Sequence, residues 1–230
     1  MPDTHADHPA FPLVLATANP HKVAEFRAIL TDLPILGLAD LDPPPGGFRE
    51  PDETGDTFEA NATIKALSYA EQTGRWCLAD DSGLEVDALA GAPGVISSHY
   101  FNDGRTDGEA EGMSRDERDQ RNNAKLLREL DGVPLEQRDA RFVCVIALAA
   151  PPSDGAPARL VRTVRGSFEG RIGLPGDVPR GEHGFGYDPI FLVKPELTQT
   201  SAELSPGRKN TLSHRAAAAA RLREQLQATP

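Results

Sequence analysis

The sequence predicts an α/β domain, because short apolar runs typical of buried strands alternate with segments whose apolar residues recur at helical spacing. The chain has 230 residues, 39% of them apolar and 26% charged, which is enough to bury a core and excludes a mainly disordered protein. Its 21 glycines and 20 prolines predict many turns. No internal repeat or shift in composition marks a boundary. We therefore expect one domain over residues 13–228, preceded by a disordered leader at residues 1–12.

The first expected unit is a strand, a turn and a helix. Leu13–Thr17 is a continuous apolar run, as in a strand covered on both faces. Asn19 supplies an N-cap, and Pro20 suits the first helical position. The helical apolar stripe that follows consists of Val23, Phe26, Ile29 and Leu30. Such a unit points the unpaired backbone N–H groups of the helix at its own turn.

A second helix and strand follow. Asp56 and Glu59 have the spacing of a capping box, with Asp in place of Ser or Thr. The apolar stripe of this helix consists of Ile64, Leu67 and Ala70. Trp76–Ala79 predicts the next strand, which we expect to end at Asp80.

The second half of the chain predicts a loop, a helix and a hairpin. Residues 102–118 are polar and rich in Asp, Gly, Glu and Arg, which favours a surface loop before a helix that contains Lys125–Leu130. Phe142–Ala149 is the most apolar expected strand. Pro151–Ala158 has the composition of a hairpin loop, with Arg159–Ser167 as the partner strand.

Charge and cysteine content narrow the class of protein. The chain carries 24 Lys and Arg against 35 Asp and Glu, a net charge of −11, which argues against a nucleic-acid partner. Cys77 and Cys144 lie in apolar runs and predict buried, reduced thiols. No apolar stretch is long enough for a membrane span, and the first residues lack the pattern of a secretory signal. We therefore expect a cytoplasmic protein with no membrane partner.

Two motifs carry lysines that suit a phosphate. In Thr17–Lys22, the helix dipole and the charge of Lys22 together favour an anion, although the glycines of a Walker A loop are missing. In the second motif, Glu53–Lys65, the carboxylate of Glu53 would bind a metal and the ammonium group of Lys65 would bind a phosphate. Spacing alone favours plainer interpretations, namely an Asn cap with a solvated Lys and carboxylates that only cap a helix.

The adjacent acids Asp80 and Asp81 stand at the expected end of a strand, where ligands of open α/β sheets bind. Neighbouring carboxylates repel each other, and a Mg²⁺ ion would relieve that repulsion. The alternative is an Asx-turn, in which Asp80 and Ser82 bond to nearby backbone. The two interpretations are evenly balanced on the residues alone.

Two later motifs suit a flat ligand that carries carbonyl groups. Glycines around Phe185 let the backbone approach such a ligand, Phe185 would stack on it, and Asp188 would accept from an N–H group. His214 and Arg215 stand at the start of a final helix that Ser213 caps, where cations are disfavoured unless an anion or a carbonyl-rich ligand is bound. The alternatives are a tight turn with core aromatics and a solvated pair.

In this order, the motifs resemble those of the noncanonical purine nucleoside triphosphate pyrophosphatases, also called inosine/xanthosine triphosphate pyrophosphatases. The matching stretches are LATANPHKVAEF, ETGDTFEANATIKA, LADDSGLEVDALAGAPGV, GFGYDPIF and AELSPGRKNTLSHRAA. They run from about Leu13 to the last helix. Each stretch is weak alone, but five in order are specific, and together they outweigh the plainer interpretations.

The resemblance implies hydrolysis of ITP, dITP and XTP to the monophosphate and pyrophosphate, with Mg²⁺, by a homodimer. It also implies an elongated mixed sheet with flanking helices, in two lobes around a central nucleotide-binding cleft. By match, Asp81 and Lys65 are catalytic, Asp81 as general base, while Glu53 and Asp81 hold the metal. The matched substrate-binding positions are Thr17, Asn19, Lys22, Ser82, Phe185, Gly186, Tyr187, Asp188, Lys209, His214 and Arg215.

The chain departs from the family pattern at His99. The family often has Ser-Ala-Arg-Tyr where this chain has Ser-Ser-His-Tyr at residues 97–100, so a titratable imidazole replaces a permanent cation. Residues 102–118 also look longer than the usual connection.

We also expect the site to select the purine base, and we consider two alternative functions. A donor such as Arg215 or a backbone N–H, facing the 6-oxo group, would favour hypoxanthine and xanthine over adenine. A Maf-like pyrophosphatase for pyrimidine or modified nucleotides is disfavoured by the GFGYD and SHR motifs. A nucleotide-binding regulator without turnover is disfavoured because Lys22, Glu53, Lys65 and Asp81 are all present.

Overall fold

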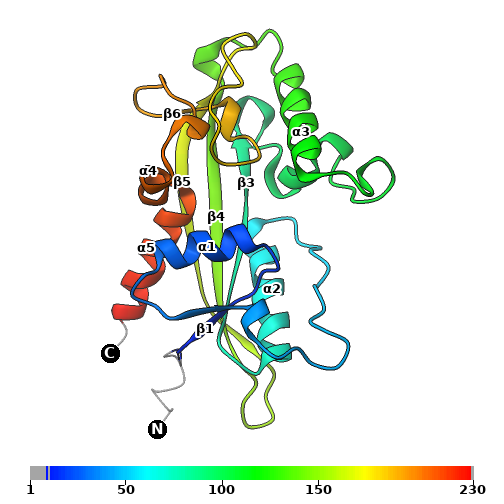
Figure 1. Ribbon diagram of the computed structural model, residues 1–230, viewed down its shortest axis with the longest axis vertical. Helices are drawn as coiled ribbons and strands as arrows, with labels where there is room; N and C mark the ends of the chain where they lie inside the picture. Colours follow the sequence, from blue (N-terminus) through cyan, green and yellow to red (C-terminus); the bar gives the residue numbers. More distant parts are fainter. Residues whose placement is uncertain (1–8, 10, 229–230) are drawn as a thin grey trace. The chain divides into compact units, whose positions relative to one another are not determined.

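The computed structural model of the chain describes residues 9 and 11–228 (Figure 1). Apart from residues 9, 11 and 12, the leader expected at residues 1–12 lies outside the described residues. Six strands form one sheet in the order β2-β1-β3-β4-β5-β6. Their bounds are β1 Leu13–Leu15, β2 Ile35–Gly37, β3 Cys77–Val86, β4 Asp139–Ala150, β5 Arg159–Ile172 and β6 Phe191–Val193.

The sheet is mixed, as expected of an α/β protein. Strand β1 runs parallel to β2 and to β3, whereas β5 and β6 are antiparallel. The helices are α1 Pro20–Ile29, α2 Phe58–Thr73, α3 Arg115–Glu129, α4 Pro206–Leu212 and α5 His214–Gln227. The short 3₁₀ helices include η3 Gly94–Asn102, η4 Gly108–Ala110 and η6 Asp188–Ile190. The predicted mixed sheet with flanking helices is therefore confirmed.

The chain divides into two compact units. Unit 1 comprises Met1–Asp81, Cys144–Gly166 and Arg215–Pro230, and unit 2 comprises Ser82–Val143 and Ser167–His214. Each unit buries its own apolar cluster. The cluster of unit 1 includes Leu13, Phe26, Leu30, Leu78, Ile146 and Leu222. The cluster of unit 2 includes Leu84, Leu126, Phe142, Ile172, Tyr187 and Phe191.

Helices α1 and α5 of unit 1 lie side by side (Figure 1). Arg223 of α5 donates to the carbonyl of Ile29 at the end of α1 and pairs with Asp32. No helix among the described residues is long and apolar enough to cross a membrane. Cys77 and Cys144 are both buried, as the sequence predicts.

The N-cap of the helix α2 lies one residue later than predicted. Thr57, and not Asp56, is the N-cap, and its Oγ1 accepts from the backbone N–H of Ala60 at 3.1 Å. The reason is the burial of Phe58, which is the first helical residue and packs inward at 3% exposure. The hydroxyl directly before it is therefore in place to cap the helix.

Strand β3 does not end at Asp80, so that prediction is wrong. It runs through Asp80 and Asp81 to Val86, because each carboxylate is neutralised by a lysine and need not face water. The helix α3 also begins early, at Arg115 after the cap Ser114, and shortens the loop expected at residues 102–118.

The other predicted strands and the last helix lie where expected, although β1 ends at Leu15, two residues early, and β4 and β5 are longer than predicted. Strand β5 begins at Arg159 as predicted and continues to Ile172. The last helix begins at His214, directly after Ser213. Strands β2 and β6 were not predicted, because three residues are too few to show a period.

Candidate functional site

The turn after β1 and the start of α1 place Lys22 in unit 1. Thr17 Oγ1 accepts from the backbone N–H of Asn19 at 3.2 Å, which shapes the turn before Pro20. One helical turn later, Lys22 Nζ lies 3.0 Å from Asp80 Oδ1. Lys22 is therefore paired with a buried carboxylate and is not the solvated lysine of the plainer interpretation.

Lys65 of α2 is paired with two carboxylates of unit 1. Its Nζ donates to Glu53 Oε2 at 2.8 Å and to Asp81 Oδ1 at 3.0 Å. The lysine is only 7% exposed. Asn61 Oδ1, one turn before Lys65, accepts from the N–H of Gly55 at 2.8 Å and so ties the segment that carries Glu53 to α2.

The ionisation of this cluster follows from its burial and charges. Burial alone would lower the pKa of Lys65, but the carboxylates of Asp81, Asp80 and Glu53 outweigh it and raise the pKa. Burial raises the pKa of Asp81 to about 6, although Lys65 opposes the shift. A carboxyl group that titrates near neutral pH beside a fixed cation is suited to accept a proton during a reaction.

The donor set of Glu53 and Asp81 fits a magnesium ion. Both carboxylates bond the same ammonium group, and Asp81 Oδ2 is buried with no hydrogen-bond partner among the described residues. Among the residues that the structure describes, no group of three or more His, Cys, Asp or Glu side chains is arranged to hold a metal ion by itself. Mg²⁺ accepts one or two protein carboxylates when water and phosphate oxygens supply the rest, so the pair is sufficient.

Asp80 lies in a separate cluster with Arg215. Arg215 Nη1 lies 3.1 Å from Glu25 Oε2, and its Nε lies 3.5 Å from Asp80 Oδ2. The side chains of Asp80 and Arg215 are 1% and 4% exposed. The adjacent acids of the sequence therefore pair with different cations, and the idea that one ion relieves the repulsion between them stays a prediction.

In unit 2, Asp188 organises the glycine-rich segment around Phe185. Asp188 Oδ2 accepts from the N–H of Phe185 at 2.8 Å and from Lys209 Nζ at 2.5 Å. The carboxylate is 3% exposed. Tyr187 is also buried, and its hydroxyl donates to the carbonyl of Ser97 at 2.8 Å. Burial raises the pKa of Tyr187 well above its usual range, so its hydroxyl stays protonated.

His99, the departure from the family pattern, contacts an arginine. Its Nε2 lies 2.9 Å from Arg118 Nη1, and its Nδ1 lies 3.0 Å from Ser98 Oγ. Burial and the charge of Arg118 lower the pKa of His99. The imidazole is therefore a neutral acceptor for the guanidinium, and Arg118 supplies the permanent cation at this place.

The structure groups the predicted site residues within each unit. In unit 1 they are Thr17, Asn19, Lys22, Glu53, Lys65, Asp81 and Arg215. In unit 2 they are Ser82, Phe185, Gly186, Tyr187, Asp188, Lys209 and His214, the last stacked on Phe142 with ring centroids 5.3 Å apart.

Sequence reasoning missed Glu25 and three residues of α3. Glu25 follows Lys22 by three residues, so the two share a helix face, and this spacing was the available signal. Arg115, Asp119 and Asn123 of α3 contact Phe185 or Gly186. Their spacing of four residues was a signal for a shared face, but not for its partner.

A mixed sheet with flanking helices, and a buried lysine held between two carboxylates in unit 1, define an α/β protein with a charged candidate site. The chain belongs to the Ham1 family, whose model matches residues 13–225. It is 49% identical to the dITP/XTP pyrophosphatase of Nitratidesulfovibrio vulgaris over 92% of this chain and 94% of that protein. It is 42% identical to the dITP/XTP pyrophosphatase of Bacillus subtilis over 94% of this chain and 96% of that one.

Solved structures show the same likeness. A HAM1 protein from Coxiella burnetii is 40% identical, with a TM-score of 0.74 over 94% of this chain and 98% of that chain. The Staphylococcus aureus Ham1 protein is 36% identical, with a TM-score of 0.71 over 94% of this chain and 97% of that one. The resemblance to the inosine/xanthosine triphosphate pyrophosphatases, drawn from the sequence, is confirmed.

Proposed function

We propose that this protein hydrolyses the noncanonical purine nucleoside triphosphates ITP, dITP, XTP and dXTP to the nucleoside monophosphate and pyrophosphate. The reaction removes these nucleotides from the pool. The relatives named dITP/XTP pyrophosphatase support this function across nearly the whole chain. The single observation that carries it is Lys65, buried between Glu53 and Asp81, with one oxygen of Asp81 left without a partner.

In the proposed mechanism, the residues of unit 1 prepare the triphosphate for attack by water. Lys22 and Lys65 provide positive charge for the phosphate oxygens, and the N-terminus of α1 adds its dipole. Glu53 and Asp81 would hold Mg²⁺, which neutralises phosphate charge when bound. Asp81 accepts the proton of the attacking water. The bond between the α-phosphorus and its bridging oxygen breaks, and pyrophosphate leaves.

The proposed selection rests on the oxygen at position 6 of the base. Hypoxanthine and xanthine present an acceptor there, whereas adenine presents an amino donor. A donor facing this position would be left unpaired by adenine, at a cost of about 1–3 kcal/mol. We assign stacking of the base to Phe185, whose ring is half-buried.

A substrate panel tests the proposal. Pyrophosphate release is measured with Mg²⁺ on dITP, XTP, dGTP, dATP and dTTP, with a chelator as control. Fast, metal-dependent release from dITP and XTP, and little from the others, is the expected result. Preference for dTTP would favour a Maf-like activity instead. Tight binding of dITP that persists with Mg²⁺, without release, would favour a regulator.

We also propose a cytoplasmic homodimer. The dimer is supported by the family resemblance, and the compartment by two buried thiols, which suit a reducing environment. Light scattering after gel filtration tests the dimer. A mass near 24.7 kDa, that of one chain, would contradict it.

A further inference from the structure

One face of α3 in unit 2 contacts the segment that carries Phe185. Arg115, Asp119 and Asn123 are spaced four residues apart and therefore lie along one stripe of the helix. The Arg115 guanidinium lies 4.3 Å from the centroid of the Phe185 ring. Asp119 and Asn123 contact Gly186, the next residue of the segment.

Both backbone polar groups of Gly186 are bonded to α3. The N–H of Gly186 donates to Asp119 Oδ2 at 2.7 Å, and its carbonyl accepts from Asn123 Nδ2 at 3.1 Å. Gly186 has a φ of +64°, a left-handed conformation that favours glycine. Side chains of a helix thus replace the backbone partners that a strand or helix would have given this residue.

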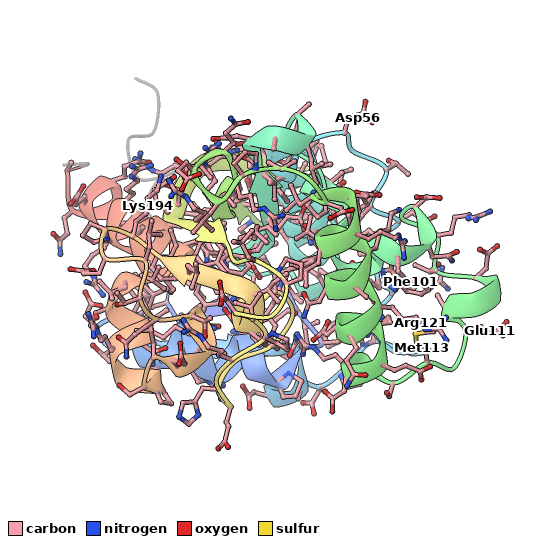
Figure 2. All side chains as sticks on the ribbon, turned by 90° about the horizontal axis from the view of Figure 1, so that it is seen from above. Asp56, Phe101, Glu111, Met113, Arg121 and Lys194 are labelled. Carbon is pink, nitrogen blue, oxygen red and sulfur yellow. The ribbon has the colours of Figure 1, made fainter. Side chains whose placement is uncertain are left out.

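Residues of α3 outside the stripe of Arg115, Asp119 and Asn123 contact a different segment. Asn122, on the neighbouring stripe, accepts instead from the N–H of Phe101 at 2.8 Å. The Arg121 guanidinium lies 5.6 Å from the centroid of the Phe101 ring. Both residues are labelled beside α3 in Figure 2. One stripe of α3 therefore holds the segment at Phe185, and another holds η3.

The carboxylate of Asp119 lies near the positive charge of Arg115. Arg115 precedes it by one helical turn, at the N-terminal end of α3, where the helix dipole disfavours a cation. Stacking on Phe185 and the nearby charge of Asp119 compensate that unfavourable position. Arg115 and Asp119 therefore both contact the segment at Phe185 and Gly186.

We propose that Asp119 is a positioning residue, which fixes the backbone of Gly186 and thereby holds the Phe185 ring in place to stack on the purine base. This inference rests on the proposed function, because that function assigns Phe185 to the base. Asp188 restrains the same segment from its other end, through the N–H of Phe185. Loss of Asp119 therefore releases the peptide next to Phe185 without removing the segment's second anchor.

Three variants test this role. Asp119→Ala removes the acceptor, Asp119→Asn keeps an acceptor oxygen, and Asp116→Ala removes an equal charge from the same helix at an exposed position. We expect Asp119→Ala to raise the KM for dITP about tenfold, the scale of one lost buried hydrogen bond. The kcat should change far less, and the other two variants should stay near the wild-type KM.

Hydrogen exchange of residues 183–188 provides a second measurement that does not depend on turnover. Asp119→Ala should exchange faster in this segment, while Asp116→Ala should match the wild type. An unchanged KM in a folded Asp119→Ala protein would overturn the proposal. So would a raised KM with unchanged exchange, or an Asp119→Asn variant as impaired as Asp119→Ala. A wild-type protein that is inactive on every nucleotide would instead refute the proposed function, and the positioning role with it.

Discussion

Asp80 and Asp81 are neighbours in β3, yet they bind cations from different helices on opposite faces of the strand. Asp80 contacts Lys22 of α1, whereas Asp81 contacts Lys65 of α2. Successive side chains of a strand point to opposite faces, and the apolar neighbours follow the same rule. Leu78 shares a cluster with α1 residues, and Cys77 Sγ lies 3.3 Å from Thr73 Oγ1 of α2.

The alternation gives the two carboxylates different partners and different surroundings. Asp80 is almost fully buried between Lys22 and Arg215, which compensate its charge. Asp81 pairs with Lys65, and burial raises its pKa to about 6. Two acids that look equivalent in the sequence therefore have different roles to test.

The first prediction concerns Asp81. Asp81→Asn should lower turnover of dITP by roughly two orders of magnitude or more, because the amide does not accept the proton of the attacking water. Pyrophosphate release at saturating dITP and Mg²⁺ measures the effect. A thermal unfolding curve confirms that the variant is folded. Turnover near the wild-type level in a folded variant would contradict the assignment.

The second prediction concerns pH and the cation. Protonated Asp81 is not a base, so kcat/KM should rise as pH increases through about 6 at low Mg²⁺. The midpoint should fall as Mg²⁺ increases, since the ion and the proton compete for one carboxylate. Rate profiles at several Mg²⁺ concentrations provide the measurement. A midpoint independent of Mg²⁺ would count against Asp81 as a ligand.

The third prediction concerns the effect of Lys65 on the pKa of Asp81. Lys65 lowers the pKa of Asp81, so Lys65→Met should raise that pKa further. The acid limb of kcat/KM should then move to higher pH, in addition to any loss of rate. Matching the wild-type profile after this substitution would show that the two groups do not interact in solution.

The fourth prediction concerns the buried ion pairs of Arg215. Arg215→Ala should reduce the free energy of unfolding by about 3–5 kcal/mol, because Glu25 loses its buried partner and Asp80 keeps only Lys22. Arg223→Ala is the control, since its pair with Asp32 is half-exposed and worth about 1 kcal/mol or less. Urea unfolding of both variants gives the comparison, and equal losses would argue against the buried network.

The fifth prediction concerns His99. Because burial and Arg118 lower its pKa, its imidazole should titrate below the ordinary value of 6.5. Arg118→Ala removes one of the two causes and should raise the midpoint without restoring it fully. An NMR titration, assigned with a His99→Gln variant, follows the change. Titration of wild-type His99 above 6.5 would show that the guanidinium contact is absent in solution.

Much of the fold was predictable because its signals are local. The continuous apolar run of β4 and the helical apolar spacing of α1 are both visible in neighbouring residues of the sequence. The missed elements include the three-residue strands β2 and β6 and the seven-residue helix α4, which are too short to show a clear period. The error at Asp80 had a different cause. A strand was expected to end at charged residues, yet the lysines of two distant helices allow β3 to continue.

The sequence by itself determined the α/β class, the order of the main elements and the motifs that identify the family, since these depend on neighbouring residues and their order. Only the tertiary structure decided which charges meet. Arg215 pairs with Glu25, from which it is separated by 190 positions in the sequence, and Gly186 bonds to Asp119, 67 positions away. Such pairs depend on how elements pack, because burial makes an unpaired charge or N–H costly and no local pattern specifies its partner.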